Sequence, residues 1–370
     1  MANTTTVESL EMTLFNDIYR GRRALITGHT GFKGSWLALW LRELGANITG
    51  IALPPNTSPN HWDLIDVGIA DHRLDIRDDK ALLRLVDDAQ PEIVFHLAAQ
   101  PLVRRSYHDP LETWSTNVMG TANLIEACRS TDSVRAIVVV TTDKVYENKE
   151  WRWGYREIDR LGGHDPYSAS KAATELVVSS YRKAFFHASN APLLATARAG
   201  NVIGGGDWSE DRLIADVVRA ITSRTSLKVR SPQATRPWQH VLECLSGYLL
   251  LGQMLLEGRH EYADAWNFGP DPEGNRTVND VLSIFETNWP GLTRHTTTEP
   301  QHYEATLLYL DSAKAKASLG WQPVWKLQEA VAMTAHWYHA YLEEGRIESP
   351  TQLAQYIEAA RSAGLPWCRK

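Results

Sequence analysis

One stretch near the start of the chain constrains the fold more than any other. The apolar run from Ala24 to Thr27 leads into GHTGFKG, in which Gly28, Gly31 and Gly34 recur at every third position, and then into the helical sequence SWLALWLRELG. A strand, a glycine turn and a helix in this order form a βα unit whose helix N-terminus can receive a pyrophosphate. The spacing alone is a weak signal, but the flanking strand and helix make it strong.

Apolar runs and helical stretches continue to alternate after this unit. The predicted strands are residues 47–53, 93–100, 136–141 and 193–198, and the predicted helices are residues 111–128 and 167–185. Runs that are apolar on both faces are typical of parallel strands. The alternation predicts an α/β fold with a Rossmann-like, doubly wound parallel sheet. Ligands of such sheets lie at the carboxyl ends of the strands, where Gly28, Ala98 and Thr142 fall.

The alternation weakens after the glycine run Gly204-Gly205-Gly206, which indicates a smaller C-terminal lobe built over the sheet edge and holding the substrate. The expected division is a flexible leader at residues 1–20, a dinucleotide-binding Rossmann domain with the catalytic residues at 21–199, a mostly substrate-binding lobe at 200–345, and a tail at 346–370. Some segments of the lobe are expected to return to the Rossmann domain. The tail has helical periodicity and no assigned function.

Composition excludes several classes of function. The net charge of −6 offers no basic surplus for binding nucleic acid or an anionic membrane. The leading residues lack an export signal, and no window is apolar enough to span a bilayer, so a cytoplasmic protein is expected. The cysteines, Cys128, Cys244 and Cys368, are scattered without metal-ligand spacing and are expected to be reduced thiols. No metal site is predicted.

The cofactor is expected to be NAD. The strand at residues 47–53 ends in Leu53-Pro54-Pro55, without the carboxylate that usually binds the adenosine ribose, and no arginine follows to hold a 2′-phosphate. His29 could meet the ribose instead, and Asp75 could meet the adenine or cap the next helix. The predicted cofactor-binding residues are Gly28, His29, Gly31, Phe32, Gly34, Asp75, Ile76, Leu97, Ala98, Ala99, Tyr167 and Lys171.

A second constellation indicates redox chemistry on a hydroxyl group. Tyr167 and Lys171 are four residues apart and share one face of a predicted helix. An ammonium beside a phenol, aided by a cationic nicotinamide, favours the phenolate and makes it a usable base. Thr142, at the end of a predicted strand, can hydrogen-bond the same hydroxyl, whose carbon then yields a hydride to the nicotinamide.

Several segments together resemble the extended short-chain dehydrogenase/reductase family that acts on nucleotide sugars. They run from about residue 18 to about residue 330 and include GHTGFKGSWL, HLAAQPLV, NVMGTANLIEAC, TTDKVYENKEW, WGYRE, LGGHDPYSASK, RAGNVIGGGDW, RPWQHVLE and LDSAKAKASLGWQP. The resemblance is greatest to the 4,6-dehydratase branch that acts on CDP-glucose. It implies an NAD-dependent, redox-neutral loss of water that gives a CDP-4-keto-6-deoxyhexose for deoxysugar or polysaccharide biosynthesis. It also implies a homodimer or homotetramer.

The resemblance extends to individual residues. Asp143 would protonate the departing hydroxyl, and Lys144 stands where related dehydratases place a glutamate base. Lys144 could act as that base only if its pKa is depressed, or it could simply pair with Asp143 or a phosphate. The predicted substrate-binding residues are Gln100, Asn117, Asn201, Trp208, Arg212, Arg236 and Tyr303.

Three alternatives remain open at this stage. The chain could be a dehydratase for GDP-mannose or dTDP-glucose, or a nucleotide-sugar 4-epimerase, which needs Thr142, Tyr167, Lys171 and NAD but has no use for Asp143 and Lys144. A non-catalytic dinucleotide sensor is the remote alternative, because a sensor would not need all of these reactive groups.

Overall fold

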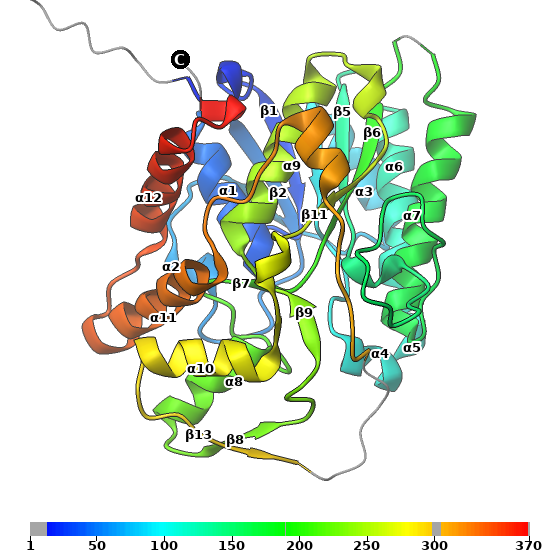
Figure 1. Ribbon diagram of the computed structural model, residues 1–370. Helices are drawn as coiled ribbons and strands as arrows, with labels where there is room; N and C mark the ends of the chain where they lie inside the picture. Colours follow the sequence, from blue (N-terminus) through cyan, green and yellow to red (C-terminus); the bar gives the residue numbers. More distant parts are fainter. Residues whose placement is uncertain (1–12, 189, 298–304, 369–370) are drawn as a thin grey trace, which may run out of the picture.

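The centre of the molecule is a seven-stranded parallel sheet (Figure 1). It belongs to a computed structural model that describes residues 13–188, 190–297 and 305–368. The strand order is β11-β6-β5-β4-β1-β2-β3. The strands are β1 (Arg23–Thr27), β2 (Asn47–Ala52), β3 (Ala70–Arg73), β4 (Ile93–His96), β5 (Ala136–Val140), β6 (Leu193–Ala199) and β11 (Ala265–Phe268). This confirms the predicted α/β fold.

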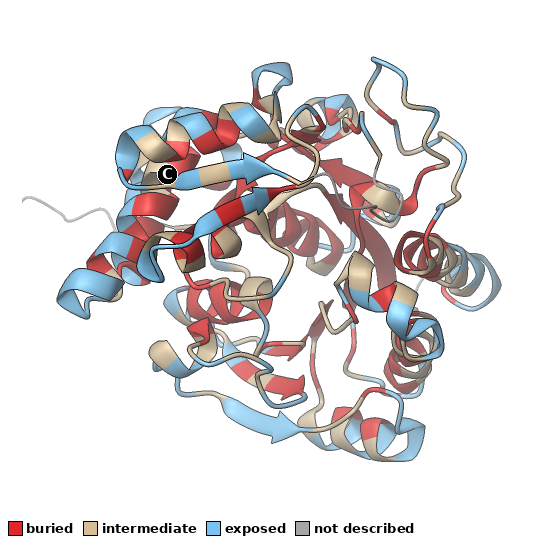
Figure 2. Ribbon diagram, turned by 90° about the horizontal axis from the view of Figure 1, so that it is seen from below, coloured by how far each residue is buried: buried red, intermediate tan, exposed pale blue. Residues whose placement is uncertain are grey.

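Helices cover both faces of the sheet, as a doubly wound fold requires. One face packs against α1 (Phe32–Glu43) and α9 (Val241–Leu256), and the other against α3 (Asp79–Ala89), α6 (Gly120–Arg129) and α7 (Pro166–Ala184). The central strands are buried between these layers (Figure 2), and every residue of β4, β5 and β6 is buried, whereas the edge strand β3 is exposed. The continuous apolar runs in the sequence reflect this two-sided burial.

The helix predicted over residues 111–128 is interrupted. It consists of α5 (Pro110–Trp114), a π-helical turn (Ser115–Met119) and α6. Such turns frequently occur at functional sites, and this one carries Asn117. Further helices outside the smaller lobe are α2 (His61–Leu64), α4 (Val103–His108), α11 (Leu327–Glu344) and α12 (Ser349–Ser362). None of the helices in the described ranges has the length and apolar character needed to cross a bilayer.

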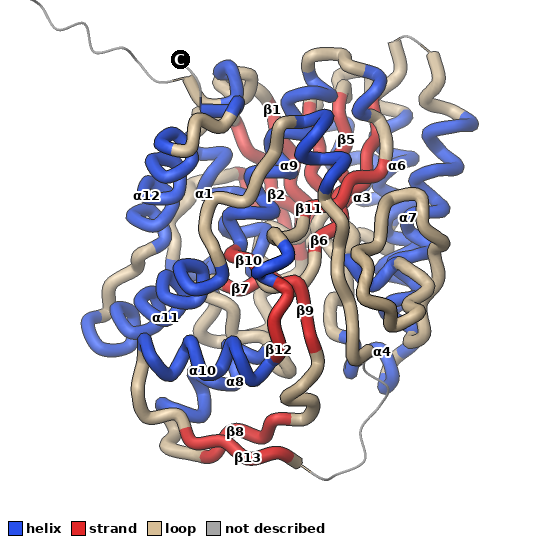
Figure 3. Tube along the Cα trace, viewed as in Figure 1, coloured by secondary structure: helices blue, strands red, loops and turns tan. Residues whose placement is uncertain are grey.

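A smaller lobe lies below the main sheet (Figure 3). Its short strand pairs are β7 (Val202–Ile203) with β10 (Gln239–His240), β8 (Ser226–Val229) with β13 (Thr293–Thr296), and β9 (Thr235–Pro237) with β12 (Asn275–Thr277), and its helices are α8 (Leu213–Thr222) and α10 (Val278–Asn288). Helix α9 and strand β11 leave this lobe and pack in the main domain. The division of the chain at residue 200 is therefore not a clean boundary in space.

Both ends of the described chain belong to the core, which corrects the expectation of a flexible leader for its described part. Phe15 and Tyr19 are almost completely buried, so the predicted leader is wrong for residues 13–20. The ring of Phe15 stacks on Trp367 with centroids 5.0 Å apart. Tyr356 on α12 donates a hydrogen bond to Glu243 on α9 at 2.8 Å. Apolar aromatic burial between the two ends holds them against α1 and α9.

Candidate active site

A cavity of about 370 Å³ lies at the carboxyl ends of β1, β4 and β5. Parallel strands bring their carboxyl ends to one edge, so loops far apart in the sequence meet here. The predicted cofactor-binding residues that line it are Gly28, Gly31, Phe32, Gly34, Asp75, Ile76, Leu97, Ala98, Ala99, Tyr167 and Lys171.

The glycine turn is shaped for close approach. Gly28 has a φ of +77°, and a Cβ there would lie 2.7 Å from the Ala98 nitrogen. At Gly34 a Cβ would lie 2.1 Å from the Gly28 oxygen. A side chain at either position would collide with backbone atoms, so the two glycines let the turn lie close to the end of β4 and to the first turn of α1. Backbone N–H groups and the helix dipole at that first turn favour a phosphate. The turn and the small residues beyond β4, which line the same cavity, fit a dinucleotide.

The far end of this cavity would receive the adenosine. Leu53 and Ile76 line it, together with Asp75. Asp75 pairs with Arg77 at 2.5 Å, and the hydrogen bond from Arg77 is the main cause that lowers the pKa of Asp75. Asp75 does not cap the next helix, because Asp78 accepts the N-terminal hydrogen bond of α3. Asp75 is thus left at the cavity wall.

His29 is an exception among the predicted cofactor residues. Its side chain is completely buried, and its Nε2 lies 2.9 Å from Asp71 Oδ1. A Cβ at Gly50 would come within 2.6 Å of the ring, so the imidazole lies against the β2 backbone. Burial lowers the pKa of His29 despite the nearby Asp71. The expectation that His29 meets the ribose is corrected, because its ring points into the protein and not into the cavity.

A second cavity, of about 220 Å³, joins the first and extends into the smaller lobe. Both cavities are lined by Lys144, Asn201 and Arg212. Basic side chains outnumber acidic ones along its wall, and Arg236 is among them. A dinucleotide in the first cavity and an anionic ligand in the second would therefore meet beside Lys144.

Thr142, Asp143 and Lys144 form a hydrogen-bonded cluster immediately after β5. Thr142 Oγ1 donates to Asp143 Oδ1 at 2.9 Å, and Lys144 Nζ binds the same oxygen at 2.9 Å. Lys144 Nζ also donates to Asn201 Oδ1 at 3.4 Å. Asp143 is fully buried, and its second oxygen has no hydrogen-bond partner among the described residues. Lys144 is thus the member of the pair that reaches both cavities.

Tyr167 and Lys171 come from the first turns of α7, which Asp165 caps by accepting a hydrogen bond from the Ser168 N–H. Lys171 Nζ donates to the Val140 carbonyl at 3.1 Å. Burial lowers the pKa of Lys171 to about 8, with a smaller contribution from Lys33. Burial raises the pKa of Tyr167 to about 12, although Arg212 opposes this shift. The expected phenolate is therefore not favoured by the protein alone, because desolvation outweighs the nearby positive charge.

Three of the predicted substrate residues have other surroundings than expected, and a fourth lies outside the described residues. Gln100 lines the dinucleotide cavity, but its side chain binds Leu102 and Thr113. Asn117 is fully buried and joins Gln100 to Ser170 on α7. These two amides are corrected to positioning roles, because their hydrogen bonds are used within the protein. Trp208 packs against α11 aromatics, which include Trp337 at 5.6 Å, and lines neither cavity. Tyr303 lies outside the described residues.

Sequence reasoning missed two features of this site. Lys33, inside the glycine turn, lines the dinucleotide cavity. Its position between Phe32 and Gly34, both predicted to bind the cofactor, was the signal that could have identified it. A buried ion pair joins Glu175 on α7 to Arg198 on β6 at 2.9 Å. Thr141 also donates to Glu175, at 2.5 Å. No local sequence pattern could have revealed this pair, because its two residues are far apart in sequence and meet only where α7 packs against β6.

Sheet, glycine turn and paired cavities together define a Rossmann-type dinucleotide-binding protein with a second ligand site. Residues 25–334 match the family described as GDP-mannose 4,6 dehydratase. This match covers most of the chain, so the chain belongs to that family.

Comparison with curated proteins shows a strong similarity to one relative. The chain is 44% identical over 352 residues to CDP-glucose 4,6-dehydratase of Salmonella typhimurium, covering 93% of this chain and 98% of the relative. It is 27% identical to dTDP-glucose 4,6-dehydratase of Xanthomonas campestris, covering 85% of this chain and 92% of that protein.

Solved structures share the fold. An epimerase from Methanothermobacter thermautotrophicus superposes with a TM-score of 0.78 at 22% identity, covering 89% of this chain and 96% of that one. A dTDP-glucose 4,6-dehydratase from Streptomyces venezuelae, solved with NAD bound, gives 0.73 at 23% identity, covering 87% and 97%. These likenesses concern the architecture of the chain.

Proposed function

We propose that the protein is an NAD-dependent hydro-lyase that converts CDP-glucose to CDP-4-keto-6-deoxyglucose. The observation that carries this proposal is the Thr142-Asp143-Lys144 cluster at the junction of the two cavities, with Tyr167 on the facing helix. The strong similarity to the Salmonella CDP-glucose 4,6-dehydratase supports the choice of nucleotide. The dinucleotide-shaped cavity, and the NAD bound in a structural neighbour, support the choice of cofactor.

The first part of the reaction removes hydrogen from carbon 4 of the hexose. Bound NAD supplies the hydride acceptor and donor that make the overall reaction redox-neutral. Tyr167 takes the proton of the 4-hydroxyl, and Thr142 hydrogen-bonds the same oxygen. Lys171, fixed to the Val140 carbonyl, places positive charge on the α7 face that carries Tyr167. Because burial raises the pKa of Tyr167 to about 12, it can act as a base only with the added charge of the oxidised nicotinamide beside it.

The second part eliminates water across carbons 5 and 6. The ketone at carbon 4 makes the carbon 5 proton acidic. Transfer of one proton from Lys144 to Asp143, across their 2.9 Å contact, produces a neutral amine and a carboxylic acid. The amine then accepts the carbon 5 proton, and the acid protonates the carbon 6 hydroxyl, which leaves as water. The pair returns to its original ionic form. The hydride taken from carbon 4 would then return to carbon 6, and one proton would return to carbon 5 in place of the one that Tyr167 took, which completes the 4-keto-6-deoxy product and leaves no net change in the cofactor.

The diphosphate of the substrate would lie between these groups and the smaller lobe. Asn201, Arg212 and Arg236 line that part of the second cavity. Guanidinium groups suit phosphate because each offers a planar fork of donors. Asn201 also accepts a hydrogen bond from Lys144, so contact with the diphosphate would be linked to the reacting pair.

A 4-epimerase with the same fold is the second candidate, because some structural neighbours are epimerases. It would use Thr142, Tyr167 and Lys171 alone. The buried Asp143 in contact with Lys144 favours dehydration, because an epimerase needs no acid and base for an elimination. GDP-mannose, dTDP-glucose and UDP-glucose remain as alternative dehydratase substrates.

The test is to incubate the purified protein with NAD and, separately, CDP-, dTDP-, UDP- and GDP-hexoses. We expect CDP-glucose to give the alkaline absorbance of a 4-keto-6-deoxy sugar with no net accumulation of reduced cofactor. Accumulation of reduced cofactor, or a galactose-series product, would rule out the dehydratase. Preference for another nucleotide would keep the reaction and change the substrate.

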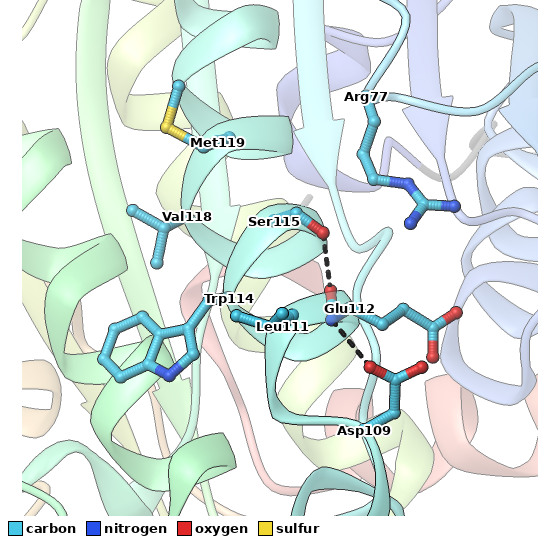
Figure 4. A pocket seen from close by; sticks show the side chains of 8 residues that line it. All are labelled: Arg77, Asp109, Leu111, Glu112, Trp114, Ser115, Val118 and Met119. Atoms are coloured by element: carbon cyan, nitrogen blue, oxygen red, sulfur yellow. Dashed lines mark hydrogen bonds between the residues drawn. The ribbon is translucent and has the colours of Figure 1, made fainter.

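We further propose that the protein works in the cytoplasm as a homodimer or a dimer of dimers. The face formed by α5 and the π-helical turn exposes Leu111, Trp114 and Met119, and these side chains line a surface groove beside Arg77 and Glu112 (Figure 4). Exposed apolar side chains clustered on one face favour contact with a partner chain.

A further inference from the structure

The second cavity has two chemically different ends. Lys144 and Arg212 mark the end that it shares with the dinucleotide cavity. The opposite end is formed by α8 and β8, and Leu213, Asp216 and Leu227 line it without lining the dinucleotide cavity. Figure 1 shows α8 and β8 in the lobe away from the main sheet. If the hexose lies beside Lys144, as the proposed function requires, the nucleobase lies at the α8 and β8 end.

This distal end is apolar apart from a few charged groups. Leu227 and Val229 are both 6% exposed and, with Leu213, offer walls suited to a flat pyrimidine ring. Lys228 within β8 and Arg230 just after it also line the cavity and bring positive charge. Asp216, one turn of α8 beyond Leu213, places a carboxylate among these groups.

The Asp216 carboxylate is held in place by Arg219. The guanidinium of Arg219 binds Asp216 Oδ1 and also donates to the backbone oxygens of Trp208 at 2.9 Å and Ser209 at 3.2 Å. Three acceptors thus fix Arg219, and Arg219 in turn fixes Asp216. Burial raises the pKa of Asp216 despite the hydrogen bond from Arg219, as expected for a carboxylate partly removed from water.

We propose that Asp216 selects cytosine by accepting a hydrogen bond from its 4-amino group. A carboxylate is a good acceptor for this group. Uracil and thymine carry a carbonyl oxygen at the same position, so two acceptors would face each other with no proton between them. The residue would therefore discriminate by attraction to one base and repulsion of the others.

A purely structural role for Asp216 would behave differently. An acidic residue in the first turn of a helix is stabilising, and the ion pair with Arg219 adds to this. Those effects would alter folding stability but would not depend on which base is bound. The ratio of affinities for two bases is therefore the decisive measurement.

The first experiment uses the unaltered protein loaded with NAD, so no variant needs to fold. Calorimetric titration would compare CDP, UDP and the diphosphate of the pyrimidin-2-one riboside, which is CDP without the amino group. We expect CDP to bind about 10- to 100-fold more tightly than either of the others. Equal affinity for CDP and the analogue without the amino group would overturn the proposal.

The second experiment uses Asp216→Asn, whose carboxamide can donate to a base carbonyl. We expect the preference for CDP over UDP to shrink by about 10-fold or more. Asp211→Asn is the matched control: Asp211 binds Arg104 and Arg230, each at 2.9 Å, and has a φ of 59° that asparagine tolerates. We expect Asp211→Asn to weaken the binding of CDP and of UDP by the same factor. An unchanged ratio in Asp216→Asn would refute the selection of cytosine.

Failure of this inference is distinguishable from failure of the proposed function. If the unaltered protein dehydrates CDP-glucose but Asp216→Asn leaves the ratio of the CDP and UDP affinities unchanged, only the role of Asp216 is wrong. If it dehydrates no CDP-glucose and binds CDP no better than UDP, both are wrong.

Discussion

At the scale of single residues, the positions of Lys144 and Asp143 determine which of them acts as base and which as acid in the proposed elimination. Lys144 reaches both cavities, whereas Asp143 lies fully buried behind it. A lysine can replace a glutamate base here because its partner carboxylate lies 2.9 Å away and can store the proton that the lysine must first lose. In the proposed mechanism the pair is therefore the functional unit, because the role of each residue depends on the other.

Replacing Lys144 tests this unit. With Lys144→Met we expect turnover to fall about 100-fold or more, because general acid–base help is lost. Oxidation at carbon 4 does not need Lys144, so absorbance of the reduced cofactor should appear on adding CDP-glucose. Lys149→Met, on the same loop but exposed and paired with Glu147, is the control and should retain turnover. Normal turnover by Lys144→Met would remove Lys144 from the mechanism.

Lys171 provides a prediction about pH and stability. Burial lowers its pKa from the ordinary 10.5 to about 8, so folding is opposed while the ammonium must be buried. This cost is complete below about pH 8 and disappears as the pH rises toward 10.5, where the unfolded lysine also loses its proton. Its full size is roughly 3 kcal/mol.

We therefore expect Lys171→Met to raise the free energy of unfolding at neutral pH, and the gain to shrink as the pH rises toward 10.5. Urea denaturation of the parent and the variant over this range would measure it. A difference that is constant with pH would show that the lysine is not desolvated. The variant should be inactive throughout, because Tyr167 loses its neighbouring charge.

At the scale of elements, the position of α7 relative to the sheet determines how Tyr167 and Lys171 lie relative to Thr142. Helix α7 carries Tyr167 and Lys171, whereas Thr142 follows β5, so the proposed reaction needs a fixed position of α7 relative to β5. Glu175 provides this: it accepts hydrogen bonds from Thr141 beyond β5 and from Thr196 and Arg198 on β6. Asn117 adds a link from the π-helical turn to Ser170 on the same helix.

Breaking one half of the buried pair should be more harmful than removing both. We expect Arg198→Met to lower the free energy of unfolding by about 3 to 5 kcal/mol, because Glu175 is left as a buried unpaired charge. The double variant with Glu175→Leu should recover most of this loss. Chemical denaturation of the two variants checks the expectation, and equal losses in both would contradict it.

At the scale of the whole molecule, the two ends of the described chain are buried, whereas one apolar face is exposed. Phe15, Trp367 and Tyr356 fill the space beside α1, so the final helix is part of the core. On the opposite side, Leu111 is 79% exposed and Met119 is 56% exposed. The aromatic residues near the chain ends are already packed within the protein. The exposed apolar residues would be covered by the partner chain in the proposed dimer.

The proposed dimer can be tested by adding charge to this face. We expect Leu111→Glu combined with Met119→Glu to yield monomers in light scattering after size-exclusion chromatography, since two buried charges oppose association. Trp153→Glu is the matched control, because Trp153 is 73% exposed but belongs to a different loop. A parent protein that is already monomeric would refute the dimer.

The sequence alone determined what depends on neighbours along the chain. The βα unit with Gly28, the strand ending at Thr142, and the spacing of Tyr167 and Lys171 are local patterns, and their periodicity or turn chemistry is readable without a fold. The parallel sheet followed from their alternation. Gly28, Ala98 and Thr142 lie just beyond strand ends, as predicted, because the end of a strand can be read from local patterns.

Only the tertiary structure decided which way ambiguous side chains face and what they pair with. His29 turned toward Asp71 and Gly50, and Asn117 toward Gln100 and Ser170. The burial that raises the pKa of Tyr167, and the position of Asp216 at the distal end of the second cavity, arise from elements far apart in sequence. Desolvation and long-range pairing are properties of packed neighbours, so no pattern along the chain could specify them.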